Sequence, residues 1–186
     1  MVIVLKDKGS VYVAVGTNRV NSPMHTEDKI NEENVSVWRV PNSEDAIMAS
    51  TIAYGLDVDI LRYKDFKLSG AMTQNGLWRK VIPEIKSVLA SCDMMDGDEA
   101  WEPFVIAKGN RAFYINCAFM CREITDFMTL GNLEEVTHGA MLKHRDKPPV
   151  ERIAESVRFA ERVGKDRIFP IVIMNTQTRE RTVLYE

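Results

Sequence analysis

The sequence predicts an α+β fold in which two antiparallel sheets stack face to face and helix pairs cover their outer faces. The predicted elements come in runs (strands, two helices, strands, two helices, strands), whereas a parallel doubly wound sheet would alternate single strands and single helices. The predicted strands are almost continuously apolar, so both of their faces need a cover. The predicted helices carry one apolar face each. An αββα sandwich satisfies all of these patterns.

The predicted strands begin with a hairpin, because residues 2–5 and 11–15 are apolar runs joined by a polar loop that contains Gly9. A second hairpin is predicted over residues 104–115, with its turn at Gly109 and Asn110. The other predicted strands are residues 35–40, 46–49, one strand within 121–130, 168–174 and 181–185.

Helical spacing of apolar residues predicts four helices, over residues 50–63, 73–91, 133–144 and 149–163. Thr73 is the predicted N-cap of the second helix, and Pro83 should kink that helix or begin its second half. Gly164 is the expected end of the fourth helix. The acidic residues 92–102 are expected to form a loop, and their spacing does not match a calcium-binding loop.

The composition fits a single domain over residues 1–186, because a chain of 186 residues is long enough to bury one core. Hydrophobic residues make up 45% and charged residues 27%, with a net charge of −3. This balance gives no reason to expect nucleic acid or an anionic membrane as a partner. The sequence has no apolar run of membrane-spanning length and no signal-peptide pattern, and its three cysteines suit reduced thiols. We therefore expect a cytoplasmic protein.

Several segments together resemble the proteasome β-subunit and its bacterial relatives, which are N-terminal-nucleophile (Ntn) hydrolases. The resemblance lies in the element order, in Met1 to Val4, in Val13 to Gly16, in residues 33–39 and in the hairpin of residues 104–115. It implies the αββα sandwich and assembly into a homo-oligomer, in the form of a ring.

The resemblance also implies where catalytic residues would stand, and this sequence replaces them. Met1 occupies the position of the Thr, Ser or Cys nucleophile, whose own α-amine would act as base. Thr17 stands where an Asp is expected, Glu32 where a Lys is expected, and Asn132 where the family has the Ser of a Gly-Ser-Gly turn. We therefore expect a catalytically silent proteasome-like protein with no catalytic residues, acting as an assembly or binding subunit.

Two alternatives remain open. The chain could be an Ntn-type peptidase or amidohydrolase with an atypical nucleophile, for which Ser10, Thr17 and Cys117 are the candidates. It could also be an unrelated α+β binding domain, in which case a single sheet would be expected, since fold-level resemblance is only an associational argument.

A binding cleft is expected to survive the loss of catalysis. The resemblance places it near Met1, Thr17, Arg19, Lys29 and Asn132, with a small molecule or peptide as the ligand. No phosphate-binding glycine loop, zinc-binding motif or Gly-x-Ser-x-Gly motif occurs in the sequence. The sequence thus predicts neither a cofactor nor a metal.

Overall fold

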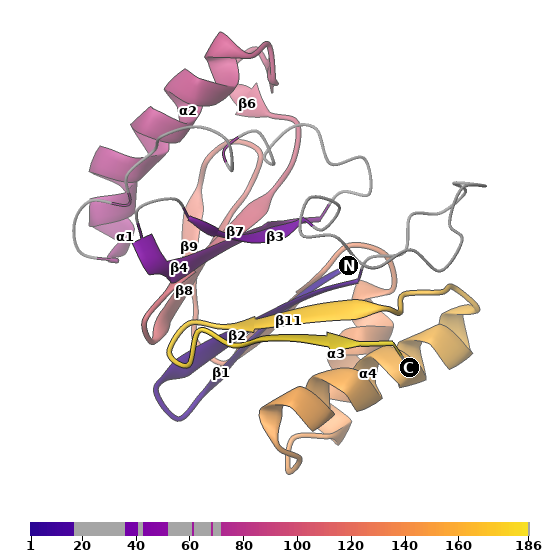
Figure 1. The fold of residues 1–186 in the computed structure, drawn as a ribbon. Coiled ribbons are helices and arrows are strands. Elements are labelled where there is room, and N and C mark those ends of the chain that lie inside the picture. The colour runs from indigo at the N-terminus through magenta and orange to yellow at the C-terminus, as the bar shows by residue number, and fades with distance from the viewer. Residues whose placement is uncertain (17–35, 41–42, 52–60, 62–67, 69–71, 186) are drawn as a thin grey trace.

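Two five-stranded antiparallel sheets stack on each other in the computed structural model, which describes residues 1–16, 36–40, 43–51, 61, 68 and 72–185 (Figure 1). The first sheet has the strand order β10-β1-β2-β11-β12 and the second β3-β4-β7-β8-β9. The strands of the first sheet are β1 (Val2–Asp7), β2 (Ser10–Gly16), β10 (Phe127–Leu130), β11 (Ile171–Asn175) and β12 (Arg181–Leu184). Those of the second are β3 (Val37–Val40), β4 (Ser43–Ser50), β7 (Phe104–Lys108), β8 (Arg111–Ile115) and β9 (Cys121–Ile124).

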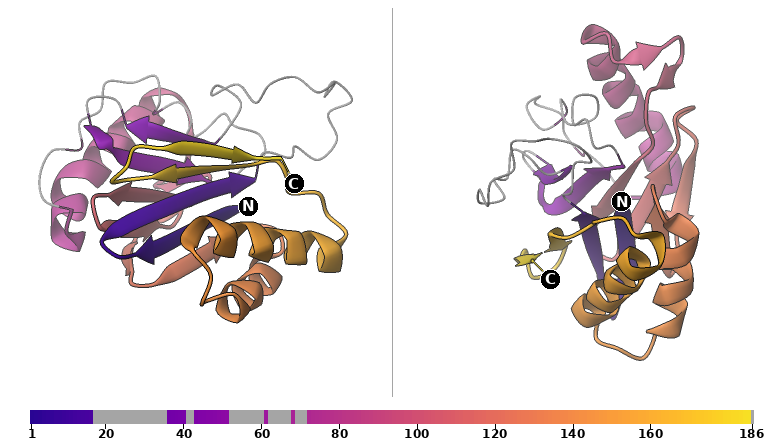
Figure 2. Two further views of the ribbon diagram at one scale, coloured as in Figure 1. Left: turned by 60° about the horizontal axis from the view of Figure 1, so that its bottom comes forward. Right: turned by 90° about the vertical axis from the view of Figure 1, so that its right-hand side faces the viewer.

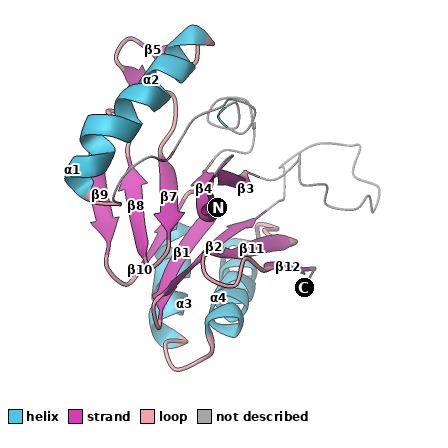
Figure 3. Cartoon of the chain, turned by 60° about the vertical axis from the view of Figure 1, so that its left-hand side comes forward, coloured by secondary structure: helices cyan, strands magenta, loops and turns pink. Residues whose placement is uncertain are grey.

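Helices cover the outer face of each sheet (Figures 2 and 3). A continuous helix formed by α1 (Gln74–Gly76), the π-helical turn η3 (Leu77–Val81) and α2 (Ile82–Ser91) lies on the second sheet. The pair α3 (Glu134–Lys143) and α4 (Pro149–Gly164) lies on the first. The predicted αββα arrangement of two antiparallel sheets is therefore confirmed. The predicted helix over residues 50–63 falls almost wholly outside the described residues.

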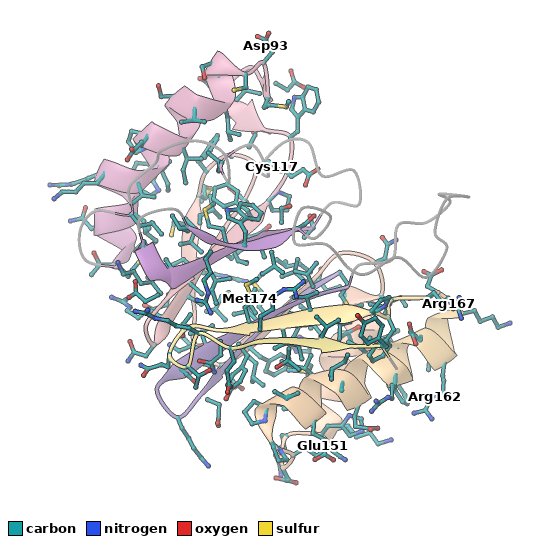
Figure 4. All side chains as sticks on the ribbon, in the orientation of Figure 1. Asp93, Cys117, Glu151, Arg162, Arg167 and Met174 are labelled. Atoms are coloured by element: carbon teal, nitrogen blue, oxygen red, sulfur yellow. The ribbon has the colours of Figure 1, made fainter. Side chains whose placement is uncertain are left out.

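Three apolar layers explain why the strands lack a polar face. The central layer lies between the sheets and includes Val4, Val13 and Met174, the last of which is labelled in Figure 4. One outer layer joins the second sheet to the α1–η3–α2 helix, and the other joins the first sheet to α3 and α4. Each sheet is thus apolar on both faces, as the continuous runs predict.

The helix that begins at Gln74 starts at the predicted N-cap, and its second half begins next to Pro83. Thr73 is the N-cap, and its side chain accepts a hydrogen bond from the backbone N–H of Gly76 at 3.0 Å. Pro83 lies in the first turn of α2, directly after the π-helical turn. Since proline lacks the N–H that a helix interior needs, the widened turn before it gives the chain a place to accommodate it.

The segment 121–130 differs from its prediction, because it forms two strands in different sheets. β9 pairs with β8 in the second sheet, and β10 pairs with β1 in the first. The chain crosses between the sheets at Asp126, whose carbonyl accepts a hydrogen bond from the Lys6 N–H at 2.8 Å. Each strand is only four residues long and neither alternates in burial, so local periodicity does not reveal the crossing.

Two smaller expectations are also wrong. The acidic stretch after the first long helix contains the short hairpin β5 (Met95–Asp96) and β6 (Glu99–Ala100) in place of a plain loop. Helix α4 runs through Gly164, and Lys165 takes the left-handed conformation (φ 56°) that ends it. An added Cβ at Gly164 would lie 2.4 Å from a methyl carbon of Leu133, so close packing explains this glycine.

In the described part of the chain, no helix combines the length and the apolar character needed to cross a bilayer.

Candidate functional site

The candidate site is built around Met1, at the head of a central strand. Strand β1 lies between β2 and β10, with Val2 paired to Val15 on one side and to Leu130 on the other. The carbonyl oxygen of Met1 accepts a hydrogen bond from the Gly16 N–H at 3.1 Å. The backbone at this position is therefore held by the sheet itself.

The side chain of Met1 packs into the layer between the first sheet and its helices. Thr137, a fully buried residue of α3, directs its hydroxyl towards the Met1 sulfur at an Oγ1–Sδ distance of 3.6 Å. Burial also lowers the pKa of the Met1 α-amine, because the charged form loses solvation. A thioether in this environment provides packing and a weak acceptor, but no nucleophile.

The turn between β10 and α3 closes over the same end of the strand. Gly131 has φ +93°, and an added Cβ there would lie 3.4 Å from the Met1 Cα and 3.6 Å from its nitrogen. Asn132, the next residue, is exposed, and Leu133 begins α3 with a left-handed backbone (φ 63°). The glycine thus lets the turn approach Met1 closely, and the turn places Asn132 near it.

The structure describes only part of the predicted site. Met1 and Asn132 lie at the same end of the first sheet, on β1 and on the turn that follows its neighbour β10. Thr17, Arg19, Lys29 and Glu32 lie outside the described residues. Thr17 follows Gly16, the residue that donates to the Met1 carbonyl.

Of the other candidate nucleophiles of the hydrolase alternative, Ser10 lies away from Met1 and Cys117 belongs to the second sheet. Ser10 pairs with Asp7 at the opposite end of the hairpin, about 20 Å along a seven-residue strand. Cys117 follows β8 in the second sheet, and burial is the main cause that raises the pKa of its thiol. Since the thiolate is the reactive form, a raised pKa makes a cysteine less reactive at neutral pH.

Thr137 is a site residue that the sequence analysis did not single out. It occupies the apolar face of α3 together with Ala140 and Met141, so its spacing is that of a core residue. The only local signal was a hydroxyl at a core position, and its partner Met1 is 136 positions away in the sequence.

Among the described residues, no group of three His, Cys, Asp or Glu side chains is placed to hold a metal ion. The absence of a cofactor or metal stays a prediction.

Comparison with known proteins gives matches by structure only. No protein-family model matches the sequence, and no curated protein matches it. Among solved structures, BPH from Thiobacillus denitrificans aligns with a TM-score of 0.72 at 15% identity, over 94% of this chain and 96% of that one. The same protein was also solved in complex with epoxomicin, with a TM-score of 0.73.

Two further solved structures agree. Anbu from Yersinia bercovieri, described as an ancestral beta-subunit, aligns with a TM-score of 0.66 at 13% identity, over all of this chain and 87% of that one. Eukaryotic HslV from Trypanosoma brucei aligns with a TM-score of 0.54 at 8% identity, covering 94% and 97%. Identities this low establish the fold alone. The chain has the proteasome-like Ntn-hydrolase fold.

Proposed function

We propose that this chain is a catalytically silent, homo-oligomeric member of the proteasome-like proteins, folded as one domain over residues 1–186, and that it acts in the cytoplasm as an assembly or binding subunit. The observation that carries the proposal is chemical. Ntn hydrolysis needs a hydroxyl or thiol at the head of the first strand, next to an amine that serves as its base. Met1 and the six residues of β1 contain neither a hydroxyl nor a thiol.

The surroundings of Met1 support the same proposal. The thioether packs in the apolar layer under α3. The hydroxyl that contacts it belongs to Thr137, which is fully buried and has no access to a substrate carbonyl. The replacements at Thr17, Glu32 and Asn132 remove the other polar groups that the resemblance implies.

A binding role would use the same end of the first sheet. We propose a small-molecule or peptide ligand near Met1 and Asn132, with Thr17, Arg19 and Lys29 contributing as the family resemblance implies. Exposed Asn132 offers both an amide donor and a carbonyl acceptor, which suits recognition of a peptide group.

Native mass spectrometry of the purified protein tests this proposal, because it reports the chain mass and the assembly mass together. We expect a homo-oligomer of chains that keep strand β1. A chain trimmed to a new N-terminal Ser, Thr or Cys would contradict the silent subunit and identify the nucleophile. A monomer at micromolar concentration would contradict the assembly role.

A further inference from the structure

Strands β8 and β9 present two hydrogen-bond donors side by side. Tyr114 of β8 pairs with Arg122 of β9, which is an edge strand of the second sheet (Figure 3). Side chains of directly opposed residues lie on the same face of a sheet, with Cβ atoms about 5 Å apart. The phenol and the guanidinium can therefore act together on one ligand.

The face that carries this pair looks towards the first sheet. Tyr114 packs against the apolar layer between the sheets, to which Ala112 and Ile124 belong. Ala112 precedes Tyr114 by two residues and Ile124 follows Arg122 by two, so the period of a strand puts all four side chains on the inner face. Tyr114 is half-buried and Arg122 is exposed. The pair thus lies where the inner face of the second sheet reaches solvent.

The direction of β8 places the pair towards the Met1 end of the sandwich. Thr176 joins the turns at the opposite end, because it accepts a hydrogen bond from the Val11 N–H and donates to the Gly109 carbonyl. Strand β8 leads away from Gly109, and Tyr114 is its last residue but one. Tyr114 therefore lies towards the end at which Met1 precedes β1.

Glu134 connects the pair to the candidate site. This exposed residue begins α3, two positions after Asn132. Burial is the main cause that raises the pKa of the Tyr114 phenol, the charges of Cys117 and Glu134 raise it further, and the charge of Arg122 lowers it. Glu134 and Arg122 are therefore close enough to act on the phenol by their charges. The raised pKa keeps the phenol protonated at neutral pH, so it is a hydrogen-bond donor there.

Neither donor is used within the described part of the protein. The side chains of Tyr114 and Arg122 form no hydrogen bond or ion pair with a described residue. Arg111, on the same two-stranded ladder, differs, because its guanidinium donates to both carboxylate oxygens of Glu123. The chain thus supplies a carboxylate to one arginine of the ladder and none to the other.

We propose that Tyr114 and Arg122 bind the carboxylate of the ligand. The guanidinium forms paired hydrogen bonds to the two carboxylate oxygens, a geometry that matches its planar fork, and the phenol donates a third. The remainder of the ligand runs past Glu134 towards Asn132 and Met1. This inference rests on the binding role in the proposed function and names the chemical group that the site recognises.

Fluorescence anisotropy of dansyl-pentaalanine with a free C-terminal carboxylate, compared with its C-terminal amide, tests this inference. We expect the acid to bind at least about tenfold more tightly, because hydrogen bonds to a charged group are stronger than those to a neutral one. Arg122→Gln should weaken binding of the acid about tenfold and Tyr114→Phe about fivefold, towards the affinity of the amide. The matched controls are Arg79→Gln, at an exposed arginine of η3, and Tyr12→Phe, at a half-buried tyrosine of β2; both should leave binding unaltered.

Glu134→Gln should have the opposite effect. It removes a negative charge near the bound carboxylate, so the acid should bind about two- to fivefold more tightly. A residue with a role in folding alone would not produce a gain in affinity. Competition by N-acetylalanine distinguishes the sources of the carboxylate. Equal affinities for this small acid and the pentapeptide assign a small-molecule ligand, and tighter binding of the pentapeptide assigns a peptide end.

The inference is overturned if the acid and the amide bind alike, or if neither binds at protein concentrations up to about 1 mM. It is also overturned if Arg79→Gln weakens the acid as much as Arg122→Gln does. If Tyr114→Phe fails to fold by circular dichroism, Arg122→Gln and Glu134→Gln decide the question, since both side chains are exposed. Mass spectrometry of the recovered peptide tests the proposed function separately, because a cleaved peptide contradicts the silent subunit whatever its affinity.

Discussion

Thr176 connects three turns at one end of the sandwich through a single buried hydroxyl. Its Oγ1 accepts a hydrogen bond from the Val11 N–H at 3.0 Å and donates to the carbonyl of Gly109. It therefore joins the β1–β2 hairpin and the β11–β12 turn of the first sheet to the β7–β8 turn of the second. One side chain thus links the two sheets.

Thr176→Val keeps the shape of this side chain and removes its hydrogen bonds. We expect the free energy of unfolding to fall by about 1–3 kcal/mol, because a buried donor and acceptor are left without a partner. The urea midpoint measures this. Thr178→Val is the control: the same substitution two residues away, at an exposed hydroxyl, should change stability by less than about 0.5 kcal/mol. Equal effects at the two positions would contradict the role given to Thr176.

Glu123 forms a second polar link between the sheets. Its carboxylate accepts hydrogen bonds from Arg111, with an Nε–Oε1 distance of 2.9 Å, and lies 3.9 Å from the Lys6 ammonium of β1. The hydrogen bonds from Arg111 are the main cause that holds the pKa of Glu123 below its usual value. The interacting side chains of Arg111 and Glu123 are about one third exposed, which limits the energy of the pair.

The stability contribution of Glu123 should depend on pH in one direction. Because its pKa is lower in the folded chain than in the unfolded chain, the pair stabilises the fold above the unfolded pKa. That stability is lost as the pH falls through the folded pKa. We expect Glu123→Gln to cost about 0.2–1 kcal/mol at pH 7 and to match the wild type in acid. Urea unfolding at several pH values measures this. A Glu123→Gln effect that is independent of pH would contradict the argument.

At the scale of elements, two glycines show how packing decides the outcome of the same substitution. Gly16 ends β2 against Ile168, where an added Cβ would lie 2.4 Å from Ile168 Cγ2 and 3.0 Å from its carbonyl oxygen. Gly139 lies inside α3, where an added Cβ meets nothing within 4 Å.

Alanine should therefore have opposite effects at the two glycines. We expect Gly16→Ala to lower stability by about 1–3 kcal/mol, since β2 must shift away from Ile168. Gly139→Ala should raise stability by about 0.5–1 kcal/mol, because alanine costs less backbone entropy in a helix. Thermal unfolding of both variants measures the pair. A destabilising Gly139→Ala would show that α3 packs against a neighbour at this point.

The elements themselves were largely predictable, and their partners were not. Long periodic segments such as residues 73–91 and 149–163 appear as helices close to their predicted bounds, and the hairpins at residues 2–15 and 104–115 are confirmed. The crossing at Asp126 was missed, because which sheet a strand joins depends on pairing with distant strands such as β1. The β5–β6 hairpin was missed because two-residue strands carry no measurable period.

For the candidate site, the family resemblance implied that Met1 and the turn at Asn132 belong together, and the structure places them at one end of the first sheet. Their role in binding stays a prediction. The contact of Met1 with Thr137 joins residues 136 positions apart, and no local pattern reports such a pair. The sequence also did not predict that Trp78 and Trp101 are exposed, since tryptophan occurs both in protein cores and at interaction surfaces.

At the scale of the whole molecule, the fold is proteasome-like, but the first strand offers no nucleophile. The sandwich matches BPH and Anbu over nearly the whole chain. Yet the residue before its first strand, Met1, carries a thioether, and the strand itself carries aliphatic, basic and acidic side chains only. This contrast is the basis of our proposal that the protein keeps the architecture and uses it for binding and assembly.

Peptide hydrolysis by the purified protein, measured with a panel of fluorogenic peptides, tests the central claim most directly. The account predicts no turnover above that of a heat-denatured sample, with or without the variants Ser10→Ala, Thr17→Ala, Cys117→Ala and Thr137→Val. Turnover that copurifies with the protein and disappears in one of these variants would contradict the account and identify the nucleophile.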